Sequence, residues 1–325
     1  MTCPRTAPAR AAAPARRPKR AILARCVLHA ALPLLACAAM LLWGCATMRP
    51  AHQAAMPPIT DHTATLDTMA VHYRTAGSGG VPLILIHGWG CDTSFWEGQW
   101  PLAQGRRVIA VDLPGHGQSD APDIFYTQDL FARAVLAVMD HAGVQRAVLA
   151  GHSMGASVAR LVALRAPKRV AAVILVDGAL FFLPQDDAAV AAWLEESARF
   201  ADMFEGPEGE AFAASFIDTL HGKDTPGALK ATVRGTILAT PRHVRLSAMR
   251  SFTDPVVWRG PPVQAPTLAV YAASPDTPPH FKAKLRAMFP HLEYDLWDGP
   301  GHFLMLEQPV RLNARITAFL AARAL

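Results

Sequence analysis

Short, uninterrupted apolar stretches recur along most of the chain, and each is followed closely by glycine, aspartate or another polar residue. A strand buried on both faces of a sheet has this pattern, because neither face needs polar side chains. The stretches are VPLILIHG (81–88), RRVIAVDLPG (106–115), RAVLAGHS (146–153), AAVILVDG (171–178) and PTLAVYAA (266–273), with MAVHYRTAG (69–77) and LEYDLWDG (292–299) as flanking strands. The sequence therefore predicts a sheet of mostly buried strands.

Stretches with helical spacing of apolar residues lie between these strands. QDLFARAVLAVMDHAG (128–143) ends in a glycine stop, and MGASVARLVALRA (154–166) follows a predicted strand directly. In the last 19 residues, 307–325, the apolar positions Leu312, Ile316, Phe319 and Leu320 fall on one helix face. Strands that alternate with helices predict an α/β fold, with a mostly parallel central sheet flanked by helices.

One interval lacks any buried-strand pattern. Residues 183–260 are rich in alanine and helical periods, as in DDAAVAAWLEESARFADMF (186–204) and GEAFAASFIDTL (209–220). An insertion of this length between two strands predicts a helical cap over one edge of the sheet. The cap would divide the core into residues 65–182 and 261–325.

Aromatic and methionine side chains are frequent in and just before this cap. Most of them could simply pack the cap onto the core, or some could line an apolar pocket for an acyl chain or an alcohol. The set comprises Phe181, Phe182, Trp193, Phe200, Met203, Phe204, Phe212 and Phe216. The sequence does not choose between individual residues.

The first 44 residues have a different composition. Seven Arg or Lys and no acidic residue occur in residues 1–25, and an apolar stretch follows up to Trp43 and Gly44. A basic segment before an apolar one is typical of an export signal. The Leu-Trp-Gly-Cys sequence resembles a bacterial lipoprotein signal and implies a lipid on Cys45. Residues 45–64 would then be a tether from the membrane to the folded domain.

Lipidation at Cys45 predicts an exported protein anchored on the periplasmic side of a bacterial membrane. Ala46 lacks the aspartate that retains some lipoproteins in the inner membrane, which favours the outer membrane. The alternative is an uncleaved helix from Ile22 to Trp43 that anchors the chain in the inner membrane. Membrane attachment is expected in either case.

The charge balance depends on this leader. The whole chain carries a formal charge of +5, but seven of its 31 basic residues lie in residues 1–44, so the remainder is slightly acidic with 26 Asp and Glu. Nothing in that remainder predicts binding of nucleic acid. Cys91 is the single cysteine after Cys45, so no internal disulfide can form in the mature protein. We expect its thiol to be a small buried apolar group rather than a reactive one.

GHSMG, residues 151–155, places one serine between two glycines, after a predicted strand and before a predicted helix. A sharp turn at that point gives the serine a positive φ, so the residues two before and two after it must be small. Gly151 and Gly155 meet this requirement. The pattern predicts that Ser153 is a nucleophile, which also needs a base, a carboxylate that orients the base, and donors for an oxyanion.

Four motifs together resemble the α/β-hydrolase fold family, over roughly residues 66–325. They are HGWG (87–90), DLPGHGQSD (112–120), GHSMG (151–155) and GPGHFLMLEQP (299–309), and they occur in the family's order. The resemblance implies an α/β-hydrolase fold with the helical cap inserted after the sixth strand. It also implies that His302 is the catalytic base, and that His87 and His116 have structural roles in turns. His152 flanks the serine and is expected to point away from it.

The acid of the triad has two candidates. The family usually carries it after the strand that follows the cap, where Asp276 in TLAVYAASPDTPP (267–279) is the only carboxylate. Asp276 is one residue later than the commonest family spacing, which a loop tolerates. Asp177, at the end of AAVILVD, is the alternative that some members use, but it lies very close to the end of its strand. We therefore prefer Asp276, and the order Ser153, Asp276, His302 agrees with the family order.

The resemblance also places the oxyanion hole. One main-chain N–H would come from Met154, after the nucleophile, and the other from Trp89 in HGWG. The histidines lack the spacing of metal ligands, and neither a metal nor a cofactor is expected.

These residues predict a serine hydrolase that cleaves small-molecule carboxylic esters through an acyl-enzyme. The alternatives on the same triad are a C–C bond hydrolase and a cofactor-free haloperoxidase or perhydrolase. A non-catalytic binding protein on this fold is less favoured, because such relatives lose the serine, the histidine or the glycines. HGWG with Phe95 and Trp96 also resembles pimeloyl-carrier methyl ester esterases, which are cytoplasmic, so the export signal argues against their substrates. The oligomeric state is left open.

Overall fold

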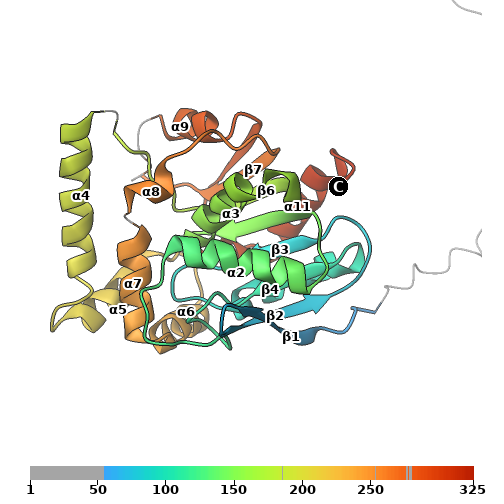
Figure 1. Ribbon diagram of the computed structural model, residues 1–325, viewed down its shortest axis with the longest axis horizontal. Helices are drawn as coiled ribbons and strands as arrows, with labels where there is room; N and C mark the ends of the chain where they lie inside the picture. The colour runs from blue at the N-terminus through green and yellow to red at the C-terminus, as the bar shows by residue number, and fades with distance from the viewer. Residues whose placement is uncertain (1–54, 185, 253, 276, 278–279) are drawn as a thin grey trace, which may run out of the picture. The chain divides into compact units, whose positions relative to one another are not determined.

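The computed structural model describes residues 55–325 except residues 185, 253, 276 and 278–279. The predicted signal sequence, Cys45 and the first half of the predicted tether, up to residue 54, lie outside these residues. Eight strands of the described part form one sheet in the order β1-β2-β4-β3-β5-β6-β7-β8 (Figure 1). The strands are β1 (Thr60–Leu66), β2 (Met69–Ala76), β3 (Leu83–Ile86), β4 (Val108–Val111), β5 (Ala147–His152), β6 (Val170–Val176), β7 (Thr267–Ala272) and β8 (Leu292–Trp297).

The sheet is parallel except at one edge. The pairs β1–β2 and β2–β4 are antiparallel, whereas every pair from β4 to β8 is parallel. The carboxyl ends of six strands therefore share one edge of the sheet, which is where ligands bind in folds of this kind. The predicted mostly parallel sheet is confirmed.

β1 begins inside the segment that was predicted to be a tether up to residue 64. Its seven residues read TDHTATL, and only Ala64 and Leu66 of the strand are buried. β1 is an edge strand paired with β2 through the main chain, so it needs little apolar surface. This explains why the apolar pattern did not reveal it.

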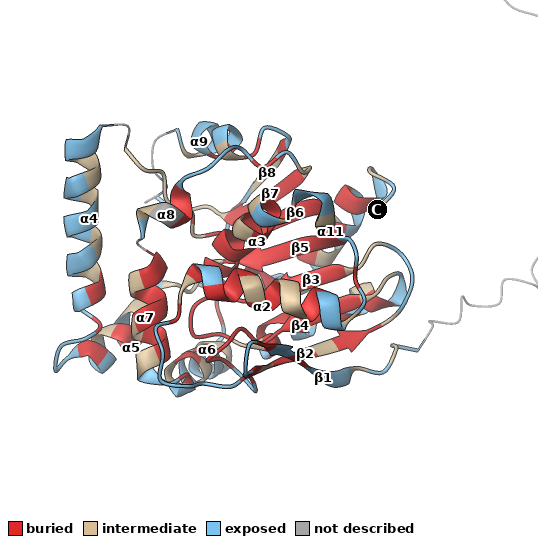
Figure 2. Cartoon of the chain, viewed as in Figure 1, coloured by how far each residue is buried: buried red, intermediate tan, exposed pale blue. Residues whose placement is uncertain are grey.

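Helices cover the sheet, and the predicted ones are present. α2 (Gln128–His141) contacts α3 (Met154–Arg165) (Figure 1). On another side, α11 (Pro309–Ala321) contacts the 3₁₀ helix η1 (Thr93–Gln104). The shorter elements are η2 (Pro167–Arg169), α9 (Phe281–Met288) and α10 (Leu304–Glu307). Figure 2 shows that burial is concentrated in the central strands and on the faces of the helices turned toward them.

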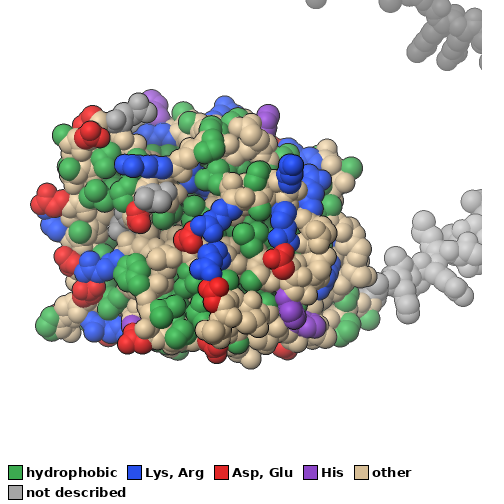
Figure 3. All heavy atoms as spheres, in the orientation of Figure 1, with side chains coloured by type: hydrophobic (Ala, Val, Ile, Leu, Met, Phe, Trp, Pro, Cys, Tyr) green, Lys and Arg blue, Asp and Glu red, His purple; other side chains and the backbone are tan. Residues whose placement is uncertain are grey.

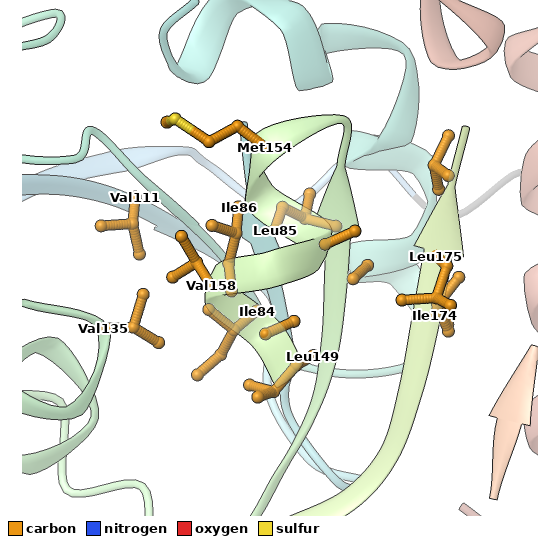
Figure 4. Packing of buried hydrophobic residues seen from close by; sticks show 14 of the residues in the cluster. Ile84, Leu85, Ile86, Val111, Val135, Leu149, Met154, Val158, Ile174 and Leu175 are labelled. Atoms are coloured by element: carbon orange, nitrogen blue, oxygen red, sulfur yellow. The ribbon is translucent and has the colours of Figure 1, made fainter. Parts of the chain in front are cut away.

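The core lies between the sheet and these helices. Ile84, Leu85 and Ile86 of β3 are fully buried, and Val158 of α3 and Val135 of α2 pack in the same cluster (Figure 4). Strand residues on both faces are apolar because both faces are covered. This packing fixes the position of the strand ends, on which the site is built.

Helices replace strands between β6 and β7, as predicted for an insertion after the sixth strand. They are α4 (Asp187–Asp202), α5 (Gly209–Thr219), α6 (Gly227–Ala239), α7 (Arg242–Phe252) and α8 (Pro255–Trp258). Figure 1 shows α4 on the side of the described domain opposite the C-terminus. Among the described residues of α4, Ala201 alone is buried, and Trp193, Ser197 and Phe200 are half-buried.

The surface carries mixed charge. On the face drawn in Figure 3, basic and acidic side chains are interspersed among apolar ones. Within residues 55–325 as described, no helix is both long and apolar enough to cross a membrane.

Candidate active site

Ser153 lies in a strained turn between β5 and α3. Its φ of 50° and ψ of −121° fall outside the regions that L-residues ordinarily adopt. The surrounding backbone fixes this conformation, because Ser153 N donates to Val176 O and Ser153 O accepts from Ala156 N and Ala179 N, at 3.2, 3.0 and 3.1 Å. Strain of this kind is kept where a side chain must be presented in one direction.

The two glycines of GHSMG are required by packing at the turn. A Cβ added to Gly151 would lie 2.1 Å from Gly155 O, and one added to Gly155 would lie 2.3 Å from Ile86 O. Both distances are well inside van der Waals contact with main-chain atoms, which cannot move aside easily. Neither glycine has a positive φ, so close approach of the backbone is what demands glycine here.

His302 is hydrogen-bonded to a carboxylate, and that carboxylate is Asp177. The Nδ1 of His302 lies 2.5 Å from Asp177 Oδ2, and both side chains are mostly buried, with 17% and 16% of their surface exposed. The other carboxylate oxygen, Oδ1, accepts from the main-chain N–H of Ala272 at 2.7 Å. Asp177 is thus held from β7 on one side while it orients the imidazole on the other.

The sequence analysis preferred Asp276 over Asp177 as the acid that orients His302, and the observed hydrogen bond does not agree with that preference. Asp276 lies outside the described residues, whereas the observed partner of His302 is the alternative that was set aside. Asp177 was disfavoured because it follows β6 immediately. Its φ of 44° resolves that objection, since the chain turns sharply at this residue and aims the carboxylate along the sheet edge.

The loop that carries His302 is fixed by two main-chain contacts. His302 N donates to Leu220 O of the helical insertion at 2.8 Å. His302 O accepts from Nε2 of His152, the residue before the serine, at 3.0 Å. The loop is therefore tied both to the nucleophile turn and to the insertion.

His152 was expected to point away from Ser153, and its ring lies against the loop of His302. The two imidazole rings are 4.6 Å apart between centroids. Burial, followed by the positive charge that His302 can carry, holds the pKa of His152 well below its usual value. A neutral His152 donates one hydrogen bond and adds no positive charge beside the base. The sequence offered one indication that His152 takes part in the site, namely its position next to Ser153.

A cavity of about 540 Å³ is lined by Ser153, His152 and His302 at the edge of the sheet. The strand-end loops and the helical insertion enclose it together, and its lining is mainly apolar and aromatic. The lining residues are Gly88, Trp89, Cys91, His152, Ser153, Met154, Ala179, Phe181, Trp193, Glu196, Ser197, Phe200, Phe216, Leu220, Ile237, Ala248, Met249, Phe252, His302 and Phe303. Among the described residues, no Lys or Arg lines it.

Trp89 and Met154 line this cavity beside Ser153. In the described part of the chain, the main-chain N–H of neither residue donates a hydrogen bond to another protein group. The loop of Trp89 is close to the turn, because a Cβ on Gly88 would lie 3.0 Å from Ser153 Cβ. Two free N–H groups near one hydroxyl are what an oxyanion hole requires.

His87 and His116 stabilise the loop of Trp89 through hydrogen bonds to main-chain N–H groups. His87 Nε2 accepts from Leu113 N at 3.0 Å, and His116 Nε2 accepts from Gly90 N at 3.3 Å. Burial lowers the pKa of both rings, and that of His116 falls to about 3. Both are neutral acceptors that hold the turn.

Cys91 is buried at the wall of the cavity, with 1% of its surface exposed. Its Sγ donates to Trp89 O at 3.5 Å, and burial raises the pKa of the thiol well above its usual value. A protonated thiol is a poor nucleophile, so Cys91 behaves as a small apolar wall residue. In the described chain, no group of three or more His, Cys, Asp or Glu side chains is placed to bind a metal.

The sheet topology, the turn at Ser153 and the inserted helices define a known class of protein. The family model for the alpha/beta hydrolase fold matches residues 81–309, and the chain belongs to this family.

Relatives within the family catalyse different reactions. The chain is 46% identical over 108 residues to the dihydrolipoyllysine-residue acetyltransferase component of the acetoin cleaving system from Pseudomonas putida, which covers 33% of the chain and 29% of that protein. It is 40% identical over 118 residues to a 2-hydroxy-6-oxononadienedioate/2-hydroxy-6-oxononatrienedioate hydrolase from Paraburkholderia phymatum, covering 34% of the chain and 40% of the relative. The chain thus spans less than half the length of each of these relatives.

A solved structure agrees over a longer span. A thermophilic esterase from Thermogutta terrifontis superimposes with a TM-score of 0.68 at 24% identity, over 82% of this chain and 100% of the esterase. At this identity the likeness concerns the fold.

Proposed function

We propose that this protein hydrolyses carboxylic esters with Ser153 as nucleophile, His302 as base and Asp177 as the orienting acid. The observation that carries the proposal is the 2.5 Å hydrogen bond between His302 and Asp177, because His302 lines the same cavity as Ser153. A serine is reactive when a base is within reach and the base is oriented by a third group. All three residues follow or adjoin strand ends of one sheet edge.

The first half of the reaction forms an acyl-enzyme. His302 accepts the proton of Ser153 Oγ through Nε2 while Oγ attacks the ester carbonyl carbon. The N–H groups of Trp89 and Met154 stabilise the negative charge that develops on the carbonyl oxygen. His302 then donates its proton to the alkoxy oxygen, the C–O bond breaks, and the alcohol leaves.

The second half returns the enzyme to its starting state. His302 takes a proton from water, and the hydroxide oxygen attacks the acyl carbon. His302 gives this proton back to Ser153 Oγ as the acid is released, so one ester and one water yield one acid and one alcohol. Asp177 stabilises the imidazolium in both halves without itself being protonated.

The lining favours an uncharged acyl group. The cavity is rich in aromatic side chains and, within the described residues, lacks Lys and Arg. A substrate with carboxylates buried against this wall would leave its charge unpaired, which is costly. This argues against the dioate substrates named for the relative from Paraburkholderia phymatum, and hence against C–C hydrolysis of such diacids. Perhydrolysis would need only hydrogen peroxide in place of water, so it is an alternative outcome at the same site.

We also propose that the enzyme acts at a bacterial membrane surface, held there by a lipid on Cys45. The proposal rests on the basic and apolar pattern of residues 1–44. Growth with a labelled fatty acid tests it: the wild-type protein would take up label and sediment with membranes, and Cys45→Ser would not be labelled. A labelled Cys45→Ser protein would contradict the proposal.

Hydrolysis of p-nitrophenyl esters, from acetate to palmitate, tests the reaction. The full-length chain in detergent is compared with Ser153→Ala, and we expect kcat to fall at least about a thousandfold in the variant. The chain length with the highest kcat/KM would measure how much of the cavity the acyl group fills. If the wild type were as inert as the variant on every ester, ester hydrolysis would be ruled out as the function.

A further inference from the structure

One negatively charged side chain lines the otherwise apolar cavity. Glu196 of α4 is the only Asp or Glu among its described lining residues. It is exposed at the rim, and in the described part of the chain it has no hydrogen-bond or ion-pair partner. A carboxylate at the mouth of an apolar cavity, without a cation of its own, is available to one that enters.

The position of Glu196 on α4 follows from helical spacing. Trp193, Glu196, Ser197 and Phe200 all line the cavity, and they are separated by three, four and seven residues, which places them on one helix face. The neighbouring Glu195 lies off this face, where its Oε1 pairs with Arg199 Nη1 at 2.6 Å. Two adjacent glutamates on one helix are thus in different environments.

Aromatic rings flank Glu196 on both sides along the helix. Trp193 meets Phe181 edge to face with centroids 5.6 Å apart, and Phe200 meets Phe216 in the same way at 5.8 Å. Aromatic faces attract organic cations, and a nearby carboxylate adds to that attraction. The same carboxylate repels anions.

From this juxtaposition we infer that the cavity accepts esters carrying an ammonium group, with the cation held between Glu196 and the adjacent rings. The inference rests on the proposed function and specifies its substrate class. Ser197 supplies a hydroxyl beside the carboxylate for a polar group next to the ammonium. The acyl carbonyl would lie at Ser153 while the cation lies at the rim.

A pair of isosteric inhibitors tests this inference. Choline and 3,3-dimethylbutan-1-ol have the same shape and differ in the positive charge, and both compete with p-nitrophenyl butyrate in the full-length enzyme. We expect the inhibition constant of choline to be about tenfold lower, which corresponds to roughly 1.4 kcal/mol. The ratio should shrink as ionic strength rises, because the carboxylate is at the rim.

Two matched variants distinguish the effect of the Glu196 carboxylate at the cavity from the effect of negative charge anywhere on α4. Glu196→Gln should bring the ratio of the two inhibition constants close to one. Glu195→Gln removes an equal charge one residue away, off the cavity face, and should leave the ratio unchanged. A wild-type ratio near one, or an equal drop in both variants, would overturn the inference.

The remaining outcomes distinguish this inference from the proposed function. If p-nitrophenyl esters are hydrolysed but the ratio is near one, only the ammonium site is wrong. If no ester is hydrolysed, the proposed function is wrong, and choline binding is then followed by the fluorescence of Trp193, with Trp193→Phe as the control. Butyrylthiocholine and dihexanoyl phosphatidylcholine, compared as substrates, distinguish a soluble amino-alcohol ester from a lipid headgroup.

Discussion

The floor and the wall of the cavity are built in different ways. We define the floor as Ser153 and His302, which line the cavity, together with Asp177, the hydrogen-bond partner of His302. Main-chain hydrogen bonds to neighbouring strands and loops hold each of these residues. The wall consists largely of the inserted helices, which contact one another through aromatic side chains such as Phe200, Phe204 and Phe216.

This difference suggests a division of roles: the floor carries out the reaction, and the wall selects the substrate. Reactive groups must keep their geometry to a fraction of an ångström, and a backbone framework provides that precision. Aromatic contacts between helices tolerate side-chain substitutions more easily. Substitutions in the wall can therefore alter which substrate is accepted without moving the catalytic residues of the floor. Variants in the floor should therefore act mainly on kcat, and variants in the wall on selectivity.

The largest effect is expected at Asp177. Asp177→Asn keeps an oxygen that can accept from Ala272 N, but its amide group would face His302 Nδ1 and hold the ring in the wrong tautomer. We expect kcat for p-nitrophenyl butyrate to fall by roughly 10³ to 10⁴, with little change in the thermal midpoint.

Asp276→Asn is the matched control for this prediction, and we expect it to change kcat less than twofold. If Asp276→Asn instead caused the large loss and Asp177→Asn did not, the acid would be the one first preferred from the sequence. Steady-state kinetics on the two variants and the wild type decides between them.

The next effect is expected where the wall meets the floor. A Cβ on Gly301 would lie 2.2 Å from Gly222 N and 2.5 Å from His221 C, so Gly301→Ala must displace the loop of His302. We expect a loss of about 1–3 kcal/mol in the free energy of unfolding from overpacking. A displacement near 1 Å should also lower kcat by about a hundredfold.

Gly206→Ala controls for the loss of a glycine as such, because nothing lies within 4 Å of a Cβ at that position. Its kcat should match that of the wild type, and its urea midpoint should not fall, since alanine at an uncrowded glycine position is neutral or slightly stabilising. A Gly301→Ala enzyme with normal kcat would show that the contact with the insertion does not position His302.

Acid should destabilise the folded protein through the buried histidine His116, which supports the loop of Trp89. The pKa of His116 is about 3 in the folded protein and about 6.5 in the unfolded chain. Below pH 6.5 the unfolded state binds the extra proton, so stability falls as the pH falls. For His116 alone, the loss between pH 6.5 and 5.5 is about 1 kcal/mol.

Urea unfolding at the two pH values measures this contribution. His116→Gln should reduce the difference between pH 6.5 and 5.5 by about 1 kcal/mol, whatever its absolute stability. His72 acts in the opposite direction, because its hydrogen bond to Asp112 raises its pKa, and the stability it contributes is lost as the pH rises. An unchanged pH dependence in His116→Gln would contradict the assignment of a neutral ring.

The sequence predicted the strand ends and the turn at Ser153 better than the contacts that connect them. The strands ending at Ile86, His152 and Val176 are recognisable because burial on both faces leaves a continuous apolar run. The glycines around Ser153 are recognisable because the tight turn forbids a side chain there. These signals are local, and the sequence alone contains them.

Other features depend on how distant segments meet. The choice of Asp177 follows from its positive φ and from Ala272 on the neighbouring strand, and neither is visible in the residues around it. Leu220 holds His302 through a carbonyl oxygen, which every residue has, so no residue type marks it. β1 is polar because it is an edge strand, and its pairing with β2 shows only in the folded chain.

The smallest predicted effect is a gain of stability in the wall. Gly235 lies inside α6, where an added Cβ meets nothing within 4 Å, and its φ is not positive. Alanine at this position removes the backbone entropy cost of glycine in a helix, so Gly235→Ala should raise the free energy of unfolding by roughly 0.5–1 kcal/mol. Because α6 does not hold Ser153, Asp177 or His302, kcat should be unchanged, whereas a comparable change at Gly301 lowers both quantities. Urea unfolding and steady-state kinetics on the same preparation check both expectations. A fall in kcat in Gly235→Ala would mean that the wall is coupled to the floor through more than the contact at Gly301, and the division between the two regions would not hold.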